Sequence, residues 1–351
     1  MTRLLPAVLM TALFSFAVHG TTLEEMESEI KKNPNRLSTR IQLANVYLKQ
    51  KNFERVIALL NSYTDQLPSQ GFLALATAYS KRDDYANEVR VLGLLADKED
   101  SDFHWRLLLG QALLKQASAQ TDLERKEKSG ISAIQQLRKA IQLEPNYKPA
   151  YDLLLNTLLQ MKANNESREL LYEGINKFGD RPELYRELCR LDANDGFLDQ
   201  AVNNCRRGIK LAPNYPDNYV FLVQALTDQQ EDQLAETDIV SAARKFQKSE
   251  FVQWAAGTLY LRKKNYPVAA RYFQTAVKAN PKAGRSQFGL AQSLFESGDE
   301  KGSLEHFIKS CELEANSIDT FLSAGGKLKQ KGNMELGNKF ISSANTCKRK
   351  Q

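Results

Sequence analysis

Residues able to do chemistry are few and widely separated in this sequence. It contains three histidines, and the two that follow the first twenty residues, His104 and His306, stand in distant parts of the chain. The four cysteines do not combine with them in the short spacings that hold zinc. No glycine-rich loop follows a strand-like segment, so the sequence contains no recognisable phosphate cradle. We therefore predict no enzymatic activity, no metal site and no cofactor.

The first twenty residues have the pattern of a secretory signal peptide. Arg3 carries a positive charge, residues 4–18 are uncharged and mostly apolar, and Val18 and Gly20 are compact residues before a cleavage point. The apolar run is shorter than the roughly 20 residues of a membrane span, although an uncleaved anchor is the alternative. No cysteine stands at the cleavage point for a lipid anchor. We predict a mature chain that begins near Thr21 and is exported to the periplasm or cell envelope.

The cysteines form two candidate disulfides, Cys189–Cys205 and Cys311–Cys347, because an oxidising compartment permits both. Cys189 takes a small packing position and Cys205 a large one on two adjacent predicted helices. Such positions are offset by about one helical turn, roughly 6 Å. We therefore favour buried thiols over a bridge for this pair, and likewise for Cys311 and Cys347, with the bridges as the alternative.

Length and composition are those of a folded protein. The chain has 351 residues, of which 42% are hydrophobic and 26% charged, and its net charge is +6. Its 48 basic and 42 acidic residues are too evenly mixed to indicate a nucleic-acid partner. The prolines are more informative, because Pro145, Pro213 and Pro281 stand 68 residues apart, which is twice 34. Such a period indicates an array of repeats.

A residue that is usually small, and that follows an apolar residue, recurs along the chain. From Leu155 onward it returns every 34 residues. The apolar residues around it are spaced as on two successive amphipathic helices. The series is Ala44, Ala76, Gly110, Leu155, Cys189, Val223, Gly257, Ala291 and Gly325.

The seventh repeat shows the full pattern. Gly257 and Tyr260 mark its first helix, Ala269 and Phe273 mark the second, and Pro281 ends it. This pattern resembles the tetratricopeptide repeat, in which small residues let two helices approach and large residues fill the space between them. The resemblance implies an all-α fold, a right-handed superhelical solenoid of about nine antiparallel helix pairs over residues 37–347. The repeats are expected to begin at Leu37, Ser69, Phe103, Lys148, Pro182, Pro216, Glu250, Gly284 and Ile318.

Three segments depart from the regular array. Residues 21–36 are expected to form a cap, with a lone helix over residues 22–32 that covers the first repeat. An insertion of about 11 residues near 114–130 either lengthens both helices of the third repeat or forms a loop. It is a tolerated surface insertion or else a spur that binds a partner. Residues 348–351 are predicted to be a basic tail.

In the family that the chain resembles, the second, fifth, ninth and twelfth residues of each first helix usually face a concave groove. The resemblance implies a ladder of ninth residues, most of them uncharged and able to form hydrogen bonds. They would bond the backbone of an extended peptide, or else they are simply polar residues on a wet surface. The ladder is Asn45, Thr77, Gln111, Asn156, Arg190, Gln224, Thr258, Gln292 and Gly326.

Two further groups at predicted groove positions suggest how a partner is held. Arg186 and Arg190 stand one helical turn apart, where two guanidinium groups could bind a carboxylate. Trp254 and Phe288 occupy equivalent places in adjacent repeats and are expected to be neighbours. The aromatic residues at such positions either belong to the core or form an exposed apolar surface for a partner. They are Phe251, Trp254, Phe288 and Phe295.

Together these features predict a non-catalytic scaffold of the bacterial cell envelope that binds a peptide or protein partner in its groove. One alternative is an assembly or secretion factor for an envelope or outer-membrane complex, docked to a membrane-associated partner. Another is a glycan-binding module, which would need aromatic rings presented flat at the spacing of sugars. The sequence predicts no nucleic-acid partner and leaves the oligomeric state open.

Overall fold

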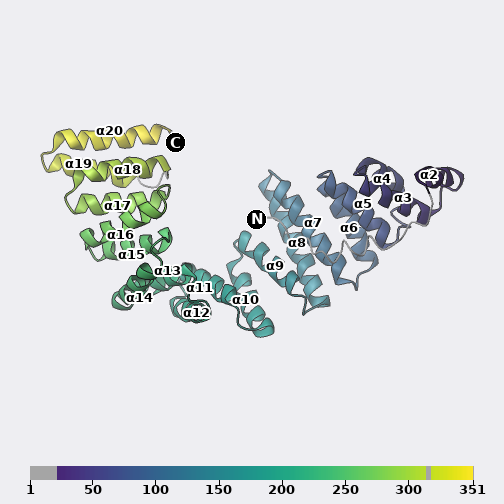
Figure 1. The fold of residues 1–351 in the computed structure, drawn as a ribbon, viewed down its shortest axis with the longest axis horizontal. Coiled ribbons are helices and arrows are strands. Elements are labelled where there is room, and N and C mark those ends of the chain that lie inside the picture. The colour runs from purple at the N-terminus through teal and green to yellow at the C-terminus, as the bar shows by residue number, and fades with distance from the viewer. Residues whose placement is uncertain (1–21, 314–317, 351) are drawn as a thin grey trace. The chain divides into compact units, whose positions relative to one another are not determined.

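The computed structural model describes residues 22–313 and 318–350, and all regular secondary structure in these ranges is helical. In these ranges, helix α2 (Leu23–Lys32) precedes nine consecutive helix pairs (Figure 1). The predicted all-α fold of helix pairs is therefore confirmed. The predicted signal peptide, residues 1–20, lies outside the described residues. Within the described ranges, no helix combines the length and the apolarity that crossing a membrane requires.

The chain divides into two compact units after Leu170, inside helix α10 (Asn164–Phe178). After α2, the first unit contains α3 (Leu37–Lys49), α4 (Phe53–Leu60), η1 (Asn61–Tyr63), α5 (Ser69–Lys81), α6 (Tyr85–Lys98), α7 (Phe103–Ala119), α8 (Leu123–Leu143) and α9 (Lys148–Gln160). The second unit contains α11 (Pro182–Asp195), α12 (Leu198–Leu211), α13 (Pro216–Asp228), α14 (Asp232–Lys245), α15 (Glu250–Arg262), α16 (Tyr266–Ala279), α17 (Gly284–Glu296), α18 (Glu300–Leu313), α19 (Ile318–Gln330) and α20 (Met334–Lys350).

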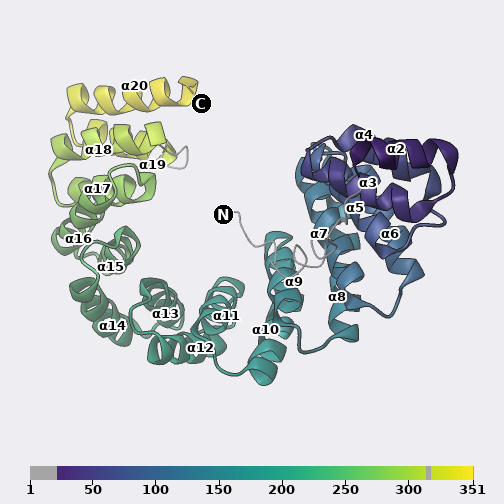
Figure 2. The same ribbon diagram turned by 45° about the vertical axis from the view of Figure 1, so that its right-hand side comes forward.

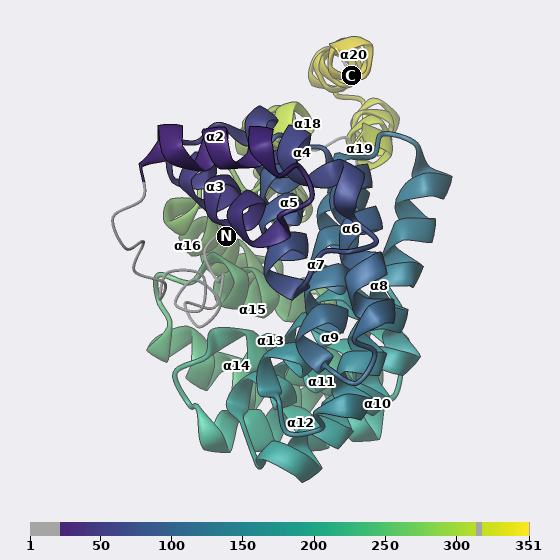
Figure 3. The same cartoon turned by 90° about the vertical axis from the view of Figure 1, so that its right-hand side faces the viewer.

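Helix α2 lies beside α3 at the start of the first unit, in agreement with the predicted cap (Figures 1 and 3). The backbone N–H of Glu25 donates to the Thr22 hydroxyl, and the backbone N–H of Thr22 donates to the Glu25 carboxylate. This reciprocal pair satisfies two N–H groups at the helix start. Helix α2 buries Met26 in the same apolar cluster that holds Ile41 and Leu43 of α3, so it covers a face that would otherwise meet water.

The first helix of every pair begins at the residue that the repeat period predicts. The regular first helix has 13 residues, as in α15, and the regular second helix has 14, as in α16. In the third repeat, α7 has 17 residues and α8 has 21, an excess of four and seven. The eleven inserted residues therefore lengthen both helices, which is the first of the two outcomes that the sequence allowed.

Eight of the nine turns within a helix pair use one residue in the left-handed backbone region. Glycine supplies it at Gly196, Gly298 and Gly332, but elsewhere a residue with a side chain does so, as at Lys264 with φ 58°. The left-handed residue ends the first helix and reverses the chain within a short turn. The remaining non-glycine positions are Lys51, Asp83, Lys162 and Gln230.

Two glycines, Gly257 at the repeated position of α15 and Gly289 two residues before that position in α17, allow the helices to pack closely around one large side chain. Phe273 of α16 is fully buried between Gly257 of α15 and Gly289 of α17. A Cβ atom on Gly257 would lie 2.8 Å from the Phe273 ring, and one on Gly289 would clash with the ring more severely. The glycines thus give the ring the volume that its burial needs.

Both pairs of cysteines are disulfide-bonded, so the favoured interpretation of buried free thiols was wrong. The Cα atoms of Cys189 and Cys205 are 4.8 Å apart, within the range that a disulfide spans, so the two positions lie closer together than the expected axial offset of roughly 6 Å. Cys311 and Cys347 join α18 to α20, the second helices of the last two repeats, across a Cα separation of 6.2 Å. One bridge therefore lies within a repeat, and the other ties the last repeat to its neighbour.

Of the predicted basic tail, residues 348–350 are helical, and residue 351 lies outside the described residues. Helix α20 continues through Lys348 and Arg349 to Lys350. Cations at this end of a helix interact favourably with its exposed carbonyl groups, which explains how the last turns persist.

The packing around Phe273 predicts opposite effects for two glycine substitutions. Gly289→Ala should lower the free energy of unfolding by about 1–3 kcal/mol, because the added methyl group overpacks the site. Gly326→Ala should raise it by about 0.5–1 kcal/mol, because nothing lies within 4 Å of that position and alanine favours the helix. Denaturant unfolding followed by circular dichroism measures both. Equal effects from the two variants would contradict this account of the packing.

Candidate partner-binding surface

The first helices of the second unit line the inner side of a curved stack. Figure 2 shows α11, α13 and α15 on the inner side of the curve and α12, α14 and α16 on the outer side. Successive first helices also contact one another from α11 through α13 and α15 to α17. The inner side of this unit is therefore a continuous surface made by first helices.

Neighbouring residues on these helices differ sharply in exposure. The repeated small position, the eighth of the first helix, is buried in eight of the nine repeats, with Leu155 as the exception. The predicted ladder occupies the ninth position, and none of its nine members is buried. Asn156, Gln224 and Thr258 are the most exposed of them. The repeat geometry therefore places the ladder residues at the solvent-facing side of every first helix, whereas their role in binding stays a prediction.

The predicted arginine pair already holds a carboxylate from its own helix. Glu187 lies between Arg186 and Arg190, with N–O distances of 3.4 Å and 3.0 Å. The guanidinium group of Arg186 also lies 5.5 Å from the centre of the Tyr215 ring. A carboxylate of a partner would therefore have to displace Glu187, which the sequence analysis did not consider.

Two of the predicted aromatic residues form a stacked pair, which we call the aromatic platform. The rings of Phe251 and Trp254 are stacked with centroids 5.9 Å apart, and Phe221 meets Phe251 edge-on at the same distance. Arg285 of α17 lies over both platform rings, 4.7 Å and 4.8 Å from their centres. The platform is thus covered by a cation and is not a bare apolar surface.

Glu250 fixes the position of Arg285. Its carboxylate accepts hydrogen bonds from Nε of Arg285 at 3.0 Å, from a second nitrogen of the same guanidinium group, and from the Ser286 hydroxyl at 2.5 Å. Burial raises the pKa of Glu250, but the hydrogen bonds from Arg285 and Ser286 outweigh burial and hold the pKa below its usual range. The carboxylate is therefore charged at neutral pH and keeps the guanidinium group over the rings.

The other two predicted aromatic residues turn toward the core. Phe295 is only 6% exposed and packs near Phe340, with ring centroids 6.0 Å apart. Phe288 is half-buried and meets Phe307 edge-on at 6.1 Å. Among the residues that the structure describes, no ring contact joins Trp254 to Phe288. Phe288 instead packs toward α18, and Trp254 stacks on Phe251 of its own helix, so the expected placing of Trp254 and Phe288 as neighbours stays a prediction.

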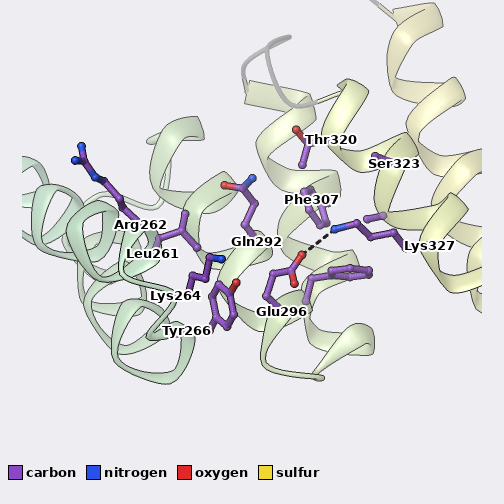
Figure 4. Close-up of a pocket in the computed structure, with 12 residues that line it drawn as sticks. Leu261, Arg262, Lys264, Tyr266, Gln292, Glu296, Phe307, Thr320, Ser323 and Lys327 are labelled. Carbon is purple, nitrogen blue, oxygen red and sulfur yellow. Dashed lines mark hydrogen bonds and ion pairs between the residues drawn. The ribbon is translucent and has the colours of Figure 1, made fainter. Parts of the chain in front are cut away.

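A pocket of about 300 Å³ opens between α15, α17 and α19, and Tyr266 of α16 and Phe307 of α18 also line it. It contains two predicted site residues, Gln292 of the ladder and Phe295. Figure 4 shows Lys264 and Lys327 on either side of the pocket, with Gln292 and Glu296 between them. The complete lining is Leu261, Arg262, Lys264, Tyr266, Gln292, Phe295, Glu296, Phe307, Thr320, Ser323, Ala324 and Lys327.

The comparisons with known proteins agree with the repeat geometry. Residues 255–311, from within α15 to within α18, match the family model for tetratricopeptide repeats. This segment, most of the seventh and eighth repeats, is similar to the tetratricopeptide repeat. No curated protein sequence matches it significantly.

Solved tetratricopeptide repeat structures are similar to parts or most of this chain. The YrrB structure, described as having an unusual peptide-binding site, is 18% identical, with 50% of this chain and 91% of YrrB covered at a TM-score of 0.42. MamA from Desulfovibrio magneticus is 18% identical in sequence. The match covers 49% of this chain and 98% of MamA, with a TM-score of 0.41. Yeast Tom70 is 13% identical in sequence. The match covers 94% of this chain and 85% of Tom70, with a TM-score of 0.48.

Glu250 and Arg285 were not predicted as site residues, although the repeat period contains a signal for them. They stand 35 residues apart in the sequence, which is one repeat period plus one residue. Arg262, which donates a hydrogen bond to the carbonyl of Thr227, is separated from it by the same number of residues. At that separation a first-helix residue meets the first helix of the next repeat. Opposite charges at this spacing would have predicted the ion pair. In the part of the chain that the structure describes, no three potential metal ligands cluster together.

Removal of the Arg285 side chain should uncover the platform. We expect Arg285→Ala to increase acrylamide quenching of Trp254 fluorescence and to lower the free energy of unfolding by about 1 kcal/mol. Both are measured in a Trp105→Phe background, which leaves Trp254 as the only tryptophan. The exposed Arg244→Ala on α14 is the matched control and should leave quenching unchanged. Unchanged quenching in Arg285→Ala would show that the guanidinium group does not shield the ring.

Proposed function

We propose that this protein is a non-catalytic scaffold that holds a peptide or protein partner against the inner faces of its first helices. The contrast between the buried eighth and the solvent-facing ninth residues carries the proposal. Because the eighth residue packs inside each repeat, the ninth residue, whose side chain is usually an amide or a hydroxyl, faces the inner surface. Repetition then produces a row of hydrogen-bonding groups at regular intervals.

Such a row suits the backbone of an extended peptide. Asparagine and glutamine side chains both donate and accept hydrogen bonds, as the peptide backbone does. In the second unit the row comprises Arg190, Gln224, Thr258, Gln292 and Gly326. A peptide bound there would gain affinity from its backbone, while the platform and the pocket near Gln292 would select its side chains.

The covered platform favours a peptide over a glycan as the partner. A sugar ring stacks on a flat aromatic face, but Arg285 lies over both Phe251 and Trp254. A glycan would have to displace a guanidinium group that Glu250 holds with two hydrogen bonds. A role in assembly or secretion of an envelope complex would use the same inner surface for a protein partner.

We further propose that the protein acts in the cell envelope. The signal-like pattern of residues 1–20 supports export. The two disulfides agree with an oxidising compartment, because cytosolic proteins rarely keep such bonds.

Photo-cross-linking at ladder positions tests the binding surface. A benzoylphenylalanine in place of Thr258 or Gln224 should give discrete cross-linked adducts in an envelope extract of the source organism. The matched controls carry the same group in place of Gln274 of α16 or Ser241 of α14, which are exposed on second helices of the same two repeats. Adducts are resolved by electrophoresis and identified by mass spectrometry. The proposal fails if the control positions give the same adducts or if the ladder positions give none.

An intact-mass measurement tests export. Protein recovered from the periplasm of a bacterial host should begin at Thr21 and weigh about 4 Da less before reduction than after, because each disulfide lacks two hydrogens. A chain that retains residues 1–20, stays in the cytoplasm and shows no change on reduction would contradict the envelope location.

A further inference from the structure

We infer that the pocket between α15, α17 and α19 binds a short acidic segment of the partner with a large apolar side chain at its centre. The inference rests on the proposed function, because it assigns the chemistry of one part of the proposed binding surface. The pocket lies within the second unit, and its lining combines an excess of positive charge with an apolar floor.

The charges of the lining favour carboxylates. Arg262, Lys264 and Lys327 contribute three positive charges and Glu296 one negative charge, so the lining carries a net charge of +2. Arg262 lies 3.8 Å from Asp232 and donates to the carbonyl of Thr227 at 2.9 Å. The pocket therefore attracts anionic groups even though part of its charge is balanced nearby.

Lys264 is the cation with the most freedom to meet a partner. It is exposed, and among the described residues no carboxylate forms an ion pair with it. Its backbone is fixed in the left-handed turn after α15, which holds the side chain at the edge of the pocket (Figure 4). A bound carboxylate would give this lysine a partner that the chain itself does not supply.

Lys327 can exchange its present partner for an incoming carboxylate. It lies 3.0 Å from Glu296, but both side chains are substantially exposed, at 55% and 39%. Ion pairs in such surroundings contribute little, because water screens and competes for both charges. The free-energy cost of replacing Glu296 with a carboxylate of the partner is therefore small. The bound segment would also gain a second contact, from Lys264.

The floor of the pocket suits one large apolar side chain. Phe295 and Phe307 line it together with Leu261 and Ala324. The amine of Lys327 lies 5.9 Å from the centre of the Phe295 ring, so charge and apolar surface adjoin. A volume of about 300 Å³ is at the lower end of ligand sites, which fits a side chain and its flanking backbone. Gln292, Thr320 and Ser323 supply hydrogen-bonding groups for that backbone.

Fluorescence anisotropy with three labelled peptides tests the inference on the full mature chain. The acidic peptide has a central phenylalanine with two glutamates on each side, and its matched versions carry glutamine or lysine in place of glutamate. We expect the acidic peptide to bind about 10-fold more tightly than the glutamine version, and the lysine version to bind more weakly still. Binding of the acidic peptide should weaken as salt is raised.

Charge-reversal variants locate the site. Lys264→Glu and Lys327→Glu should each weaken binding of the acidic peptide about 10-fold. Lys278→Glu, which makes the same charge change at an exposed position of α16 outside the pocket, should change it less than about twofold. Circular dichroism confirms that the variants are folded.

Two results would overturn the inference. One is equal binding of the acidic and glutamine peptides, and the other is equal weakening by Lys278→Glu and the pocket variants, which would indicate attraction to net charge alone. Neither result affects the proposed function, because the cross-linking positions Thr258 and Gln224 do not line the pocket. If cross-linking at those positions gives adducts but the acidic peptide binds no better than the glutamine peptide, the scaffold function stands and only the acidic specificity of the pocket is rejected.

Discussion

The close approach of paired helices at one small residue is the constraint on which the rest of this structure depends. At Gly257 and Gly289 two helices come so near to Phe273 that even a methyl group would not fit. The buried ring in turn holds α15, α16 and α17 together, although these helices belong to two successive repeats. The eighth residue of the first helix is buried in eight of the nine repeats, so related packing recurs along the series of helix pairs.

This packing also decides which side chains face solvent. Residues one place apart on a helix point about 100° apart, so a buried eighth residue leaves the ninth at the edge of the packed face. Ala291 and Gln292 illustrate the result, because the first is fully buried and the second lines the pocket. The inner surface is therefore a consequence of the core and does not need a separate folding signal.

Carboxylates from this chain accompany most of the positive groups on that surface. Glu187 lies between Arg186 and Arg190, Glu250 holds Arg285, and Glu296 pairs with Lys327. These pairs keep long cationic side chains ordered before a partner arrives, which reduces the entropy lost on binding. Lys264 stands apart from them and gives the surface a charge that a partner can balance.

The sequence by itself determined the helical fold, the start of every repeat and the ladder position, because the 34-residue period and the small residues impose one packing geometry. It left open whether the third-repeat insertion was helical, and it favoured free thiols where the structure has two disulfides. Only the tertiary structure decided that Phe295 is buried, that Phe288 turns toward Phe307 and that Arg285 covers the platform. The physical reason is that a periodic pattern fixes the backbone, whereas the direction and partners of a long side chain depend on neighbours from other repeats, whose residues the period does not specify.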